Sequence, residues 1–486
     1  MKAAIHASTE WWLAALRVLA RARHLFLPVA GLLLTACAFD RYDPRPLSTA
    51  AVADAYSARS LQSPELREFV RRHYPRAAEV WPPNQWDLES LTLAALYFNP
   101  ELEAARTRLA TTEAAMTTAA QRPNPTVQLP FQRTLNPKGG DSPWTLGIAL
   151  DIPIETAGKR GYRIDEATHL SSAARFQVAN VAWGVRNQLR TQLLNLWFAE
   201  ERTVLLQQQL QLDQRTVAML ERRQAVGDAS PWEVNQQRLT VMQSRTDLLA
   251  AQRQAAVIRV QVATVLGLRA STLDAVDLDL KAFAQGYPAP PSQTIRLQAL
   301  LNRADVLAGL AQYEASQAAL QLEVAKQYPD IHLGPGYTFD QGARKLGFDF
   351  AGLVLPIFNR NEGPIAEARS RRLEAQARVQ QLEAQAFSET DSALAAYQAI
   401  QNILKQSEEQ AAVQSRQLAA TRRSFEIGQA DHLALTLAEK SEVTAQLVLK
   451  DATFQMQQAI GRLEDAMQRP LTTSAPSGER MNPEFK

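Results

Sequence analysis

The stretch Trp144-Thr-Leu-Gly-Ile-Ala-Leu-Asp-Ile-Pro-Ile154 decides the fold of this chain. All of its even positions carry large apolar side chains. The odd positions between them carry small or polar residues, namely Thr145, Gly147, Ala149, Asp151 and Pro153. This two-residue period predicts a strand over 144–154 with one apolar face. After Gly161 the chain reaches about Val226 without a proline, so the strand is expected to lead into one long helix.

The same order of elements occurs again about 200 residues later. Leu353-Val-Leu-Pro-Ile357 corresponds to Leu150-Asp-Ile-Pro-Ile154, and the two prolines lie 203 residues apart. Two glycines that interrupt helical patterns, Gly227 and Gly428, lie 201 residues apart. The chain therefore reads as a duplication in which each half has the order helix–strand–strand–helix–helix.

The two repeats are predicted over 88–266 and 297–467, with a linker rich in glycine and proline at 267–296 between them. In the first repeat we expect a helix over 88–121, strands over about 126–133 and 144–154, and helices over 161–225 and 231–266. In the second repeat we expect a helix over 297–327, strands over about 330–339 and 346–357 with a bulge at Ala351-Gly352, and helices over 363–425 and 431–467. A proline-rich leader at 37–87 precedes them, and a tail at 468–486 is expected to be disordered.

The N-terminus has the pattern of a signal peptide over residues 1–36. Three arginines precede an apolar run, Leu25 to Leu34, that is too short to span a bilayer as a helix. The run ends in Leu34-Thr-Ala-Cys37, which resembles the bacterial lipobox, and Cys37 is the only cysteine of the chain. In such signals the cysteine becomes the acylated N-terminus. We therefore expect diacylglyceryl and palmitate-type chains on Cys37, and Ala38 after it favours the outer membrane.

Charge argues against a nucleic-acid partner. The formal net charge of the chain is +2, but residues 1–36 contribute four basic residues and one acidic residue. The remainder carries about −1, so it has no strong basic surface to attract phosphates.

The lengths of the elements predict an elongated, mainly α-helical protein with a small β part that crosses a membrane. Helices of 63–65 residues would be roughly 95 Å long at about 1.5 Å per residue. Leu404, Ala411, Leu418 and Phe425 recur every seven residues, which indicates coiled-coil packing. Strands of about 10 residues match a tilted crossing of a bilayer, where an open sheet edge is not tolerated. Four strands cannot close alone, whereas three copies would form a 12-stranded barrel with a lumen.

Taken together, these features resemble the TolC-type outer-membrane efflux family. The resemblance rests on the duplicated halves, Asn99-Pro-Glu-Leu102, the strand starts at Pro125 and Pro329, and Leu355-Pro-Ile-Phe358. Two further stretches, 151–160 and 358–364, are similar to the CzcC-like heavy-metal branch. The family implies a homotrimer in the outer membrane with a periplasmic helical tunnel. It also implies a periplasmic adaptor protein and an inner-membrane pump of the RND type as partners. The resemblance to the heavy-metal branch implies divalent heavy-metal cations as substrates.

The resemblance also assigns roles to the two helix breaks. Val226, Gly227, Ile427 and Gly428 would be the periplasmic tips that contact the adaptor, although helix-capping glycines have the same pattern. Asp228, Asp431 and Glu439 are the candidates for an acidic aperture that favours cations. For Asp228 and Asp431, N-capping of the next helix is the plain structural alternative. Family aperture acids usually lie further into the last helix, where this chain has only Glu439.

The residues do not suggest an enzyme or a cofactor. His73, His169, His332 and His432 are not spaced as metal ligands, and no nucleophile, phosphate-loop or zinc-helix motif occurs. His332 falls on the polar face of its strand, where a position on the lumen surface is expected.

Two alternatives remain open from the sequence. The same channel could serve drug efflux or type I secretion instead of metals. Alternatively, the chain could be a non-spanning periplasmic coiled-coil adaptor lipoprotein, which would explain the helices and Cys37 but not two pairs of strands of bilayer length.

Overall fold

The computed structural model describes residues 40–79, 81–136, 142–284, 301–350 and 354–471. The predicted signal peptide, Cys37, the bulge at Ala351-Gly352, the linker from 285 onward and most of the tail lie outside these ranges. The chain divides into two units, Met1–Tyr56 and Ser57–Lys486. The helix α2 (Thr49–Ser57) lies at the end of the first unit, and all other described elements belong to the second.

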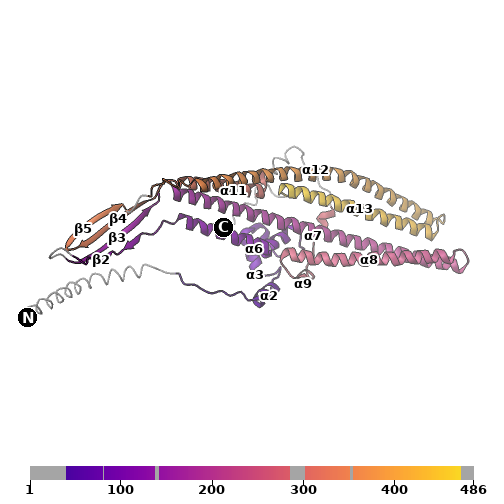
Figure 1. Cartoon of the computed structure of the whole chain (residues 1–486). Coiled ribbons are helices and arrows are strands. Elements are labelled where there is room, and N and C mark those ends of the chain that lie inside the picture. Colours follow the sequence, from indigo (N-terminus) through magenta and orange to yellow (C-terminus); the bar gives the residue numbers. More distant parts are fainter. Residues whose placement is uncertain (1–39, 80, 137–141, 285–300, 351–353, 472–486) are drawn as a thin grey trace, which may run out of the picture. The chain divides into compact units, whose positions relative to one another are not determined.

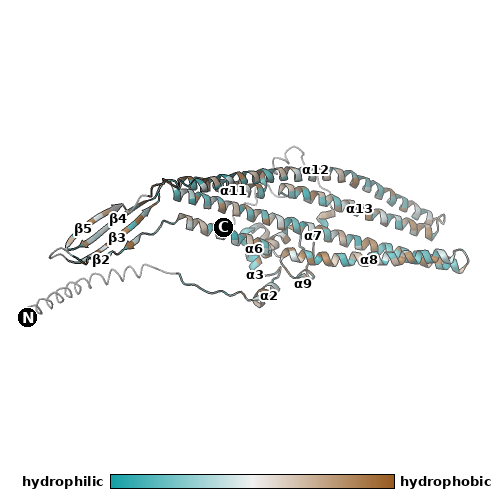
Figure 2. Cartoon of the chain, in the orientation of Figure 1, coloured by the Kyte–Doolittle hydropathy of each residue, from teal (hydrophilic) through white to brown (hydrophobic). Residues whose placement is uncertain are grey.

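Long helices dominate the second unit (Figure 1). Its α-helices are α3 (Pro64–His73), α4 (Pro75–Ala78), α5 (Leu88–Phe98), α6 (Pro100–Ala120), α7 (Lys159–Ala225), α8 (Pro231–Leu266), α9 (Ala270–Leu273), α11 (Ala304–Ala325), α12 (Glu362–Glu426) and α13 (His432–Met467), with a short 3₁₀ helix η1 (Lys281–Ala284). The prediction of two very long helices, each followed by one of about half its length, is confirmed. Apolar and polar residues are interleaved along all four, as packing on neighbouring helices requires (Figure 2).

One predicted helix, 88–121, is wrong because it is two helices. The break lies at Asn99, whose backbone is extended (φ −67°, ψ 124°) because Pro100 disfavours a helical conformation in the residue before it. The Asn99 side chain accepts hydrogen bonds from the backbone nitrogens of Glu101 and Leu102, at 2.9 and 3.2 Å, and so caps α6.

The helices pack side by side, in one order near the turns that join α7 to α8 and α12 to α13 and in a second order nearer the strands. Helix α7 contacts α8 and α13, and α13 contacts α12, which gives the order α8–α7–α13–α12 near the two hairpin turns. Nearer the strands, α7 contacts α6 and α11, and α11 contacts α12, which gives α6–α7–α11–α12. The short helices α6 and α8 thus both contact the long helix α7, and α11 and α13 both contact the long helix α12, as the summed lengths of the short helices predict.

The sheet is antiparallel and repeats this order. Its strands are β1 (Thr126–Gln128), β2 (Phe131–Arg133), β3 (Trp144–Ile154), β4 (Ile331–Asp340) and β5 (Ala343–Phe350). They are arranged β1–β3–β4–β5, and β2 pairs with β3 beyond β1. Strands β1, β3, β4 and β5 are adjacent in sequence to α6, α7, α11 and α12, respectively, so strand order and helix order agree. Within one chain the sheet is open at both edges.

Two strand predictions need correction. The single strand expected over 126–133 is split into β1 and β2 around Pro130, which has no backbone N–H for a ladder hydrogen bond. The strand expected over 346–357 begins earlier, at Ala343, because Gln341 and Gly342 have positive φ and form a tight turn. Residues 354–357 are not in a strand. Leu333 pairs with Phe350 and β4 begins at Ile331, so β4 has no residue left to pair with them.

The predicted alternation of faces holds across the whole sheet. Leu346 and Phe348 of β5 are each 80 % exposed, on the face that also carries Trp144, Leu146 and Ile148. The opposite face carries glycine, alanine and threonine together with Asp151, Asp340 and Lys345, whereas Arg133 and Arg344 lie on the apolar face, opposite Trp144 and Phe339. Apart from these two arginines at one end, one side of the sheet is therefore apolar.

Ion pairs fix the start of α7 beside the start of β4. The Lys159 ammonium lies 2.7 Å from the Asp330 carboxylate and also donates to the Tyr328 carbonyl at 2.6 Å. Asp330 in turn accepts from the Thr156 backbone nitrogen at 3.0 Å. These contacts hold the change from strand to helix in register. Among the described residues, no helix is both long and apolar enough to cross a membrane.

Candidate functional site

The chain reverses direction twice through the same turn, at the ends of α7 and α12. Gly227 and Gly428 have φ of +84° and +76°, a conformation that side chains with a Cβ rarely adopt. The Asp228 nitrogen donates to the Arg223 carbonyl at 2.8 Å, and the Gln429 nitrogen donates to the Ser424 carbonyl at 2.8 Å. Both glycines therefore close a Schellman motif, so their role as helix caps is established by geometry.

An exposed aliphatic side chain precedes each of these glycines. Val226 is 73 % exposed and Ile427 is 68 % exposed, and neither is covered by its own chain. Two apolar side chains thus project from the two turns at equivalent positions. Such positions suit contact with a partner protein, which is the role predicted for them.

The two turns differ in the residue that caps the following helix. Ser230, and not Asp228, caps α8: its hydroxyl accepts from the Glu233 nitrogen at 3.2 Å, and the Glu233 carboxylate accepts from the Ser230 nitrogen at 2.7 Å. Asp431 does cap α13, because its carboxylate accepts from the Ala434 nitrogen at 2.7 Å. Asp431 also pairs with Arg223 at the end of α7. The hydrogen bond from the Ala434 backbone nitrogen makes the largest contribution to lowering the pKa of Asp431, and the hydrogen bond from Arg223 makes the next largest.

Glu439 lies two turns into α13 and is half-buried. Its carboxylate faces two arginines, Arg215 of α7 at 3.8 Å and Arg422 of α12 at 3.6 Å. A shallow groove beside it is also lined by Gln208, Gln211 and Glu442. The three acidic residues predicted for an aperture are therefore not gathered within one chain. Two of them are paired with arginine, whereas Asp228 is exposed and takes part in no ion pair of the described residues.

Ion pairs form a row along the contact between α7 and α13, the helices through which the two repeats meet near the hairpin turns. Farthest from the turns, Glu464 of α13 pairs with Arg186 at 3.5 Å and Arg190 at 3.2 Å, both on α7. Four pairs follow toward the turns: Glu201–Lys450 at 2.7 Å, Asp213–Lys440 at 2.6 Å, Arg215–Glu439 at 3.8 Å and Arg223–Asp431. The acidic partner lies on α7 in the first two of these four pairs and on α13 in the last two. The contact between repeats is thus strongly charged.

Asp213 was missed by the sequence analysis although it is the most buried member of this row. It is 0 % exposed and accepts hydrogen bonds from Ser244 at 2.6 Å and Gln237 at 3.2 Å, both on α8, besides its pair with Lys440. One carboxylate therefore joins α7, α8 and α13. The sequence carries the signal, because Asp213 continues the spacing of the buried residues Leu206 and Leu210 and is the charged member of that stripe.

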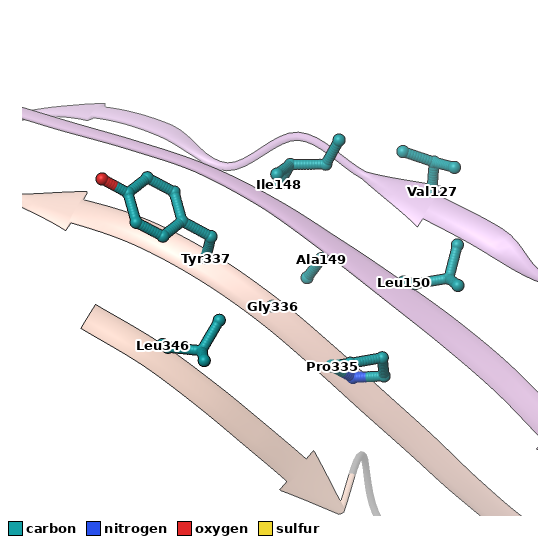
Figure 3. A pocket seen from close by; sticks show the side chains of 8 residues that line it. All are labelled: Val127, Ile148, Ala149, Leu150, Pro335, Gly336, Tyr337 and Leu346. Carbon is teal, nitrogen blue, oxygen red and sulfur yellow. The ribbon is translucent and has the colours of Figure 1, made fainter. Parts of the chain in front are cut away.

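The sheet offers a second surface, with different chemistry on its two faces. A shallow hollow on the apolar face is lined by Val127, Ile148, Ala149, Leu150, Pro335, Gly336, Tyr337 and Leu346 (Figure 3). On the polar face, the His332 ring lies 2.9 Å from the Asp151 carboxylate, and Thr145 donates to Asp340 at 2.7 Å. His332 is therefore on the polar face, as predicted. Within the described ranges, no three His, Cys, Asp or Glu side chains are placed to hold a metal ion.

Comparison with known proteins covers most of the chain. The profile of a family described as "Outer membrane efflux protein" matches residues 92–268 and 296–467, which correspond closely to the two predicted repeats. The chain is 29 % identical over 291 residues to the cobalt-zinc-cadmium resistance protein CzcC of Cupriavidus metallidurans, covering 60 % of this chain and 67 % of that protein. It is 26 % identical over 376 residues to the pyoverdine export outer membrane protein OpmQ of Pseudomonas putida, covering 70 % and 78 %.

Solved structures share the fold. The outer membrane protein VceC of Vibrio cholerae aligns with a TM-score of 0.63 at 21 % identity, over 79 % of this chain and 97 % of that one. The outer-membrane channel OprN aligns with a TM-score of 0.63 at 17 % identity, over 90 % and 99 %. CusC, a transmembrane channel, aligns with a TM-score of 0.61 at 20 % identity, over 80 % and 94 %. The fold is thus that of TolC-type channels.

Proposed function

The chain belongs to the outer membrane efflux protein family, and on this basis we propose that three copies form the exit channel of a tripartite efflux system. The channel conducts its substrate passively from a periplasmic adaptor and an inner-membrane RND pump to the outside. The observation that carries the trimer is the open sheet with one apolar face. Lipid offers no hydrogen-bond partners for its two edges, and three chains supply the strands of a 12-stranded barrel.

Divalent heavy-metal cations are the proposed substrate class. Two observations support it: the 29 % identity to a cobalt-zinc-cadmium resistance protein, and the resemblance of 151–160 and 358–364 to the heavy-metal branch. A wide pore does not need ligands to pass an ion. The absence of a three-ligand cluster from the described residues is therefore compatible with this substrate class.

The two Schellman turns are the proposed contact with the adaptor, through Val226, Gly227, Ile427 and Gly428. Their exposed aliphatic side chains support this assignment. For the aperture, the arginine partners of Asp431 and Glu439 reduce the field that these carboxylates can exert. Asp228 is therefore the acidic residue of the three with the most influence on passing cations.

The protein is proposed to be anchored in the outer membrane of a Gram-negative bacterium by lipid on Cys37, in addition to spanning it. The lipobox-like Leu34-Thr-Ala-Cys37 supports the anchor. Replacing Cys37 by Ser should abolish incorporation of labelled palmitate into the full chain, with the parent chain as control. Continued labelling of the variant would refute lipidation at this cysteine.

The metal assignment is tested by deleting the gene in its own host without a paralogue. We expect growth to stop at lower concentrations of cobalt, zinc, cadmium or nickel, and the full-length gene to restore tolerance. Organic toxicants serve as the control. Unchanged metal tolerance would remove the metal assignment and leave the channel assignment intact.

Export of an organic compound is the second candidate, because the similarity to the pyoverdine export protein covers more of this chain than the similarity to CzcC. Sensitivity of the same deletion strain to organic compounds alone would favour it. A non-spanning lipoprotein is distinguished by an alkaline carbonate wash of membranes that carry the chain without its lipid, with Cys37→Ser behind a cleavable signal peptide that is not a lipoprotein signal. Without the lipid anchor, a barrel stays in the membrane and a peripheral protein does not.

A further inference from the structure

The two arginines on the apolar face of the sheet both lie at the end of the strands that is farthest from the helices. Strand β3 leads into α7 from its Ile154 end, so Trp144 marks the distant end (Figure 1). Arg133 pairs with Trp144, and Arg344 pairs with Phe339 at a level two residues nearer the helices. Both arginine side chains are exposed. From there toward the helices, the described side chains on this face of the strands carry no charge.

The length of β3 places these arginines at one boundary of a membrane. Ile154 lies 10 residues after Trp144, which corresponds to roughly 34 Å at about 3.4 Å per residue. A strand tilt of about 40° reduces this length to a height of roughly 26 Å, and the apolar band of outer-membrane barrels is about 25 Å tall. With Ile154 at the periplasmic boundary, Arg133 therefore lies at the extracellular boundary. Arg344 lies about 5 Å deeper, within reach of that boundary for an extended arginine side chain.

Neither arginine has an acidic partner among the residues that the structure describes. The adjacent cation, Lys345, lies on the polar face and pairs with Asp340 at 2.8 Å. The guanidinium carbon of Arg133 instead lies 5.3 Å from the centre of the Trp144 ring. The sheet thus neutralises its cation on the polar face and leaves the two cations on the apolar face without a counter-ion. Basic side chains at a membrane boundary attract anionic lipid headgroups.

The chemistry and the spacing of the two arginines indicate which anion they fit. A guanidinium group binds phosphate through paired N–H donors. Arg133 on β2 and Arg344 on β5 are separated by β3 and β4, so they stand three strand spacings, or roughly 14 Å, apart. A headgroup with two separated phosphates can contact both, whereas a headgroup such as phosphatidylglycerol offers only one. Lipopolysaccharide, the lipid of the outer leaflet in Gram-negative bacteria, carries two phosphates on its lipid A disaccharide.

We propose that Arg133 and Arg344 bind the two phosphates of lipid A on the outer surface of the barrel. The inference rests on the proposed function, which places the strands in the outer membrane with their turns outward. Phe131 and Trp144, whose ring centres are 5.2 Å apart, supply an aromatic surface for the sugar and the upper acyl chains. Because the charges lie at one boundary only, the bound lipid would hold the barrel at a fixed depth.

Retention of lipid A by the purified protein tests the site. The full chain is extracted from outer membranes in mild detergent, incubated with diphosphoryl lipid A and washed, and the bound lipid is quantified by mass spectrometry. Arg133→Gln with Arg344→Gln should retain about fivefold less lipid A than the parent, because two charge-assisted contacts are lost. Arg344→Gln alone should lose more lipid than Lys345→Gln, which removes the same charge from the polar face. Equal retention by the parent and the double variant, or an equal loss in Lys345→Gln, would overturn the proposal.

Lipids with other headgroups identify what the site recognises. The parent should retain diphosphoryl lipid A better than monophosphoryl lipid A, and this preference should disappear in the double variant. Phosphatidylglycerol should be retained no better than uncharged-headgroup detergent exchange allows in either protein. Equal retention of the two lipid A forms by the parent would mean that only acyl chains are held. Arginine-dependent retention of phosphatidylglycerol would mean a general anionic surface. Either result overturns the assignment to lipid A.

Two measurements separate this inference from the function on which it rests. Light scattering should give the same assembly size for the parent and the double variant, so that misfolding does not explain a loss of lipid. A chain without its N-terminal lipid that is removed from membranes by alkaline carbonate refutes the spanning channel itself. A chain that stays in the membrane, and binds lipid A equally with and without the two arginines, refutes only the lipid site.

Discussion

At the scale of single residues, one buried carboxylate joins the two repeats near the hairpin turns. The Asp213 carboxylate binds groups on two other helices and has no access to water. A carboxylate in such a site is stable only with its partners in place, and its partners are equally dependent on it. The contact between repeats therefore relies on polar side chains that must all be present together.

Replacing Asp213 by Ala should strongly destabilise the protein. The substitution removes the partner of Lys440 and leaves the Ser244 hydroxyl buried without its acceptor. Because Lys440 retains some access to water, the expected loss is about 3 kcal/mol, at the low end for a broken buried pair. Chemical denaturation followed by circular dichroism measures it. Asp228→Ala, at an exposed site, should change stability by less than about 0.5 kcal/mol.

Asp431 gives a pH-dependent prediction. Its pKa is lowered in the folded chain, so its contribution to stability is present above the ordinary range of an aspartate and is lost as the pH falls through the lowered pKa. Asp431→Asn keeps a capping oxygen but loses the charge that attracts Arg223. The unfolding midpoint of this variant should lie below that of the parent at pH 6, and the two midpoints should converge toward pH 2. A difference that is the same at both pH values would contradict the assignment.

At the scale of elements, the helices were predictable and their interruptions were less so. The bounds of α7, α8, α12 and α13 follow from uninterrupted apolar periodicity. Gly227 interrupts this periodicity between α7 and α8, and Gly428 interrupts it between α12 and α13. The break at Asn99 was missed because the helical pattern continues across it, although Pro100 is a local signal. The split at Pro130 and the end of β5 depend on which residues pair across strands, which periodicity does not report. The ion pairs between α7 and α13 depend on the packing of distant segments.

Two helical glycines should respond oppositely to the same substitution. An added Cβ at Gly184 in α7 meets nothing within 4 Å, whereas at Gly461 in α13 it would lie 2.4 Å from the Arg190 guanidinium. Gly184→Ala should stabilise the helix by about 0.5–1 kcal/mol. Gly461→Ala should destabilise it by about 1–3 kcal/mol, since the buried Arg190 must move. Denaturation midpoints compare them, and equal shifts in both variants would show that the packing around Gly461 is wrongly described.

The apolar face of the sheet should not tolerate charge. Phe348→Arg places a cation on the proposed lipid-facing side, where it costs up to about 2–4 kcal/mol. Thr338→Arg places the same cation on the polar face. When both variants are made in a chain that lacks the lipid, with Cys37→Ser behind a cleavable signal peptide that is not a lipoprotein signal, we expect the first variant to be lost from carbonate-washed membranes and the second to be retained. Retention of both would mean that Phe348 does not face lipid.

At the scale of the whole molecule, the duplication of the chain produces two equivalent hairpin turns, and these turns together form the proposed contact with the adaptor. Replacing Val226 and Ile427 together by Asp removes both exposed aliphatic side chains without changing the Schellman glycines. Metal tolerance should fall toward that of the deletion strain, while the trimer remains intact by light scattering. Gln254→Asp, which adds the same kind of charge at an exposed site of α8 away from the turns, is the control, and full tolerance in the double variant would exclude these side chains from the adaptor contact.

The order of signs along α7 and α13 has a further consequence. Because the acidic partner changes helix between Asp213 and Arg215, only one longitudinal alignment pairs opposite charges throughout. A slip of about 10 residues, roughly 15 Å at 1.5 Å per residue, would place Asp213 against Asp431 in one direction and Arg215 close to Lys450 in the other. Sliding of one repeat past the other is thus opposed by repulsion in both directions. Any rearrangement of the helices α8, α7, α13 and α12 is better accommodated by a sideways tilt of one helical hairpin than by a shift along its axis.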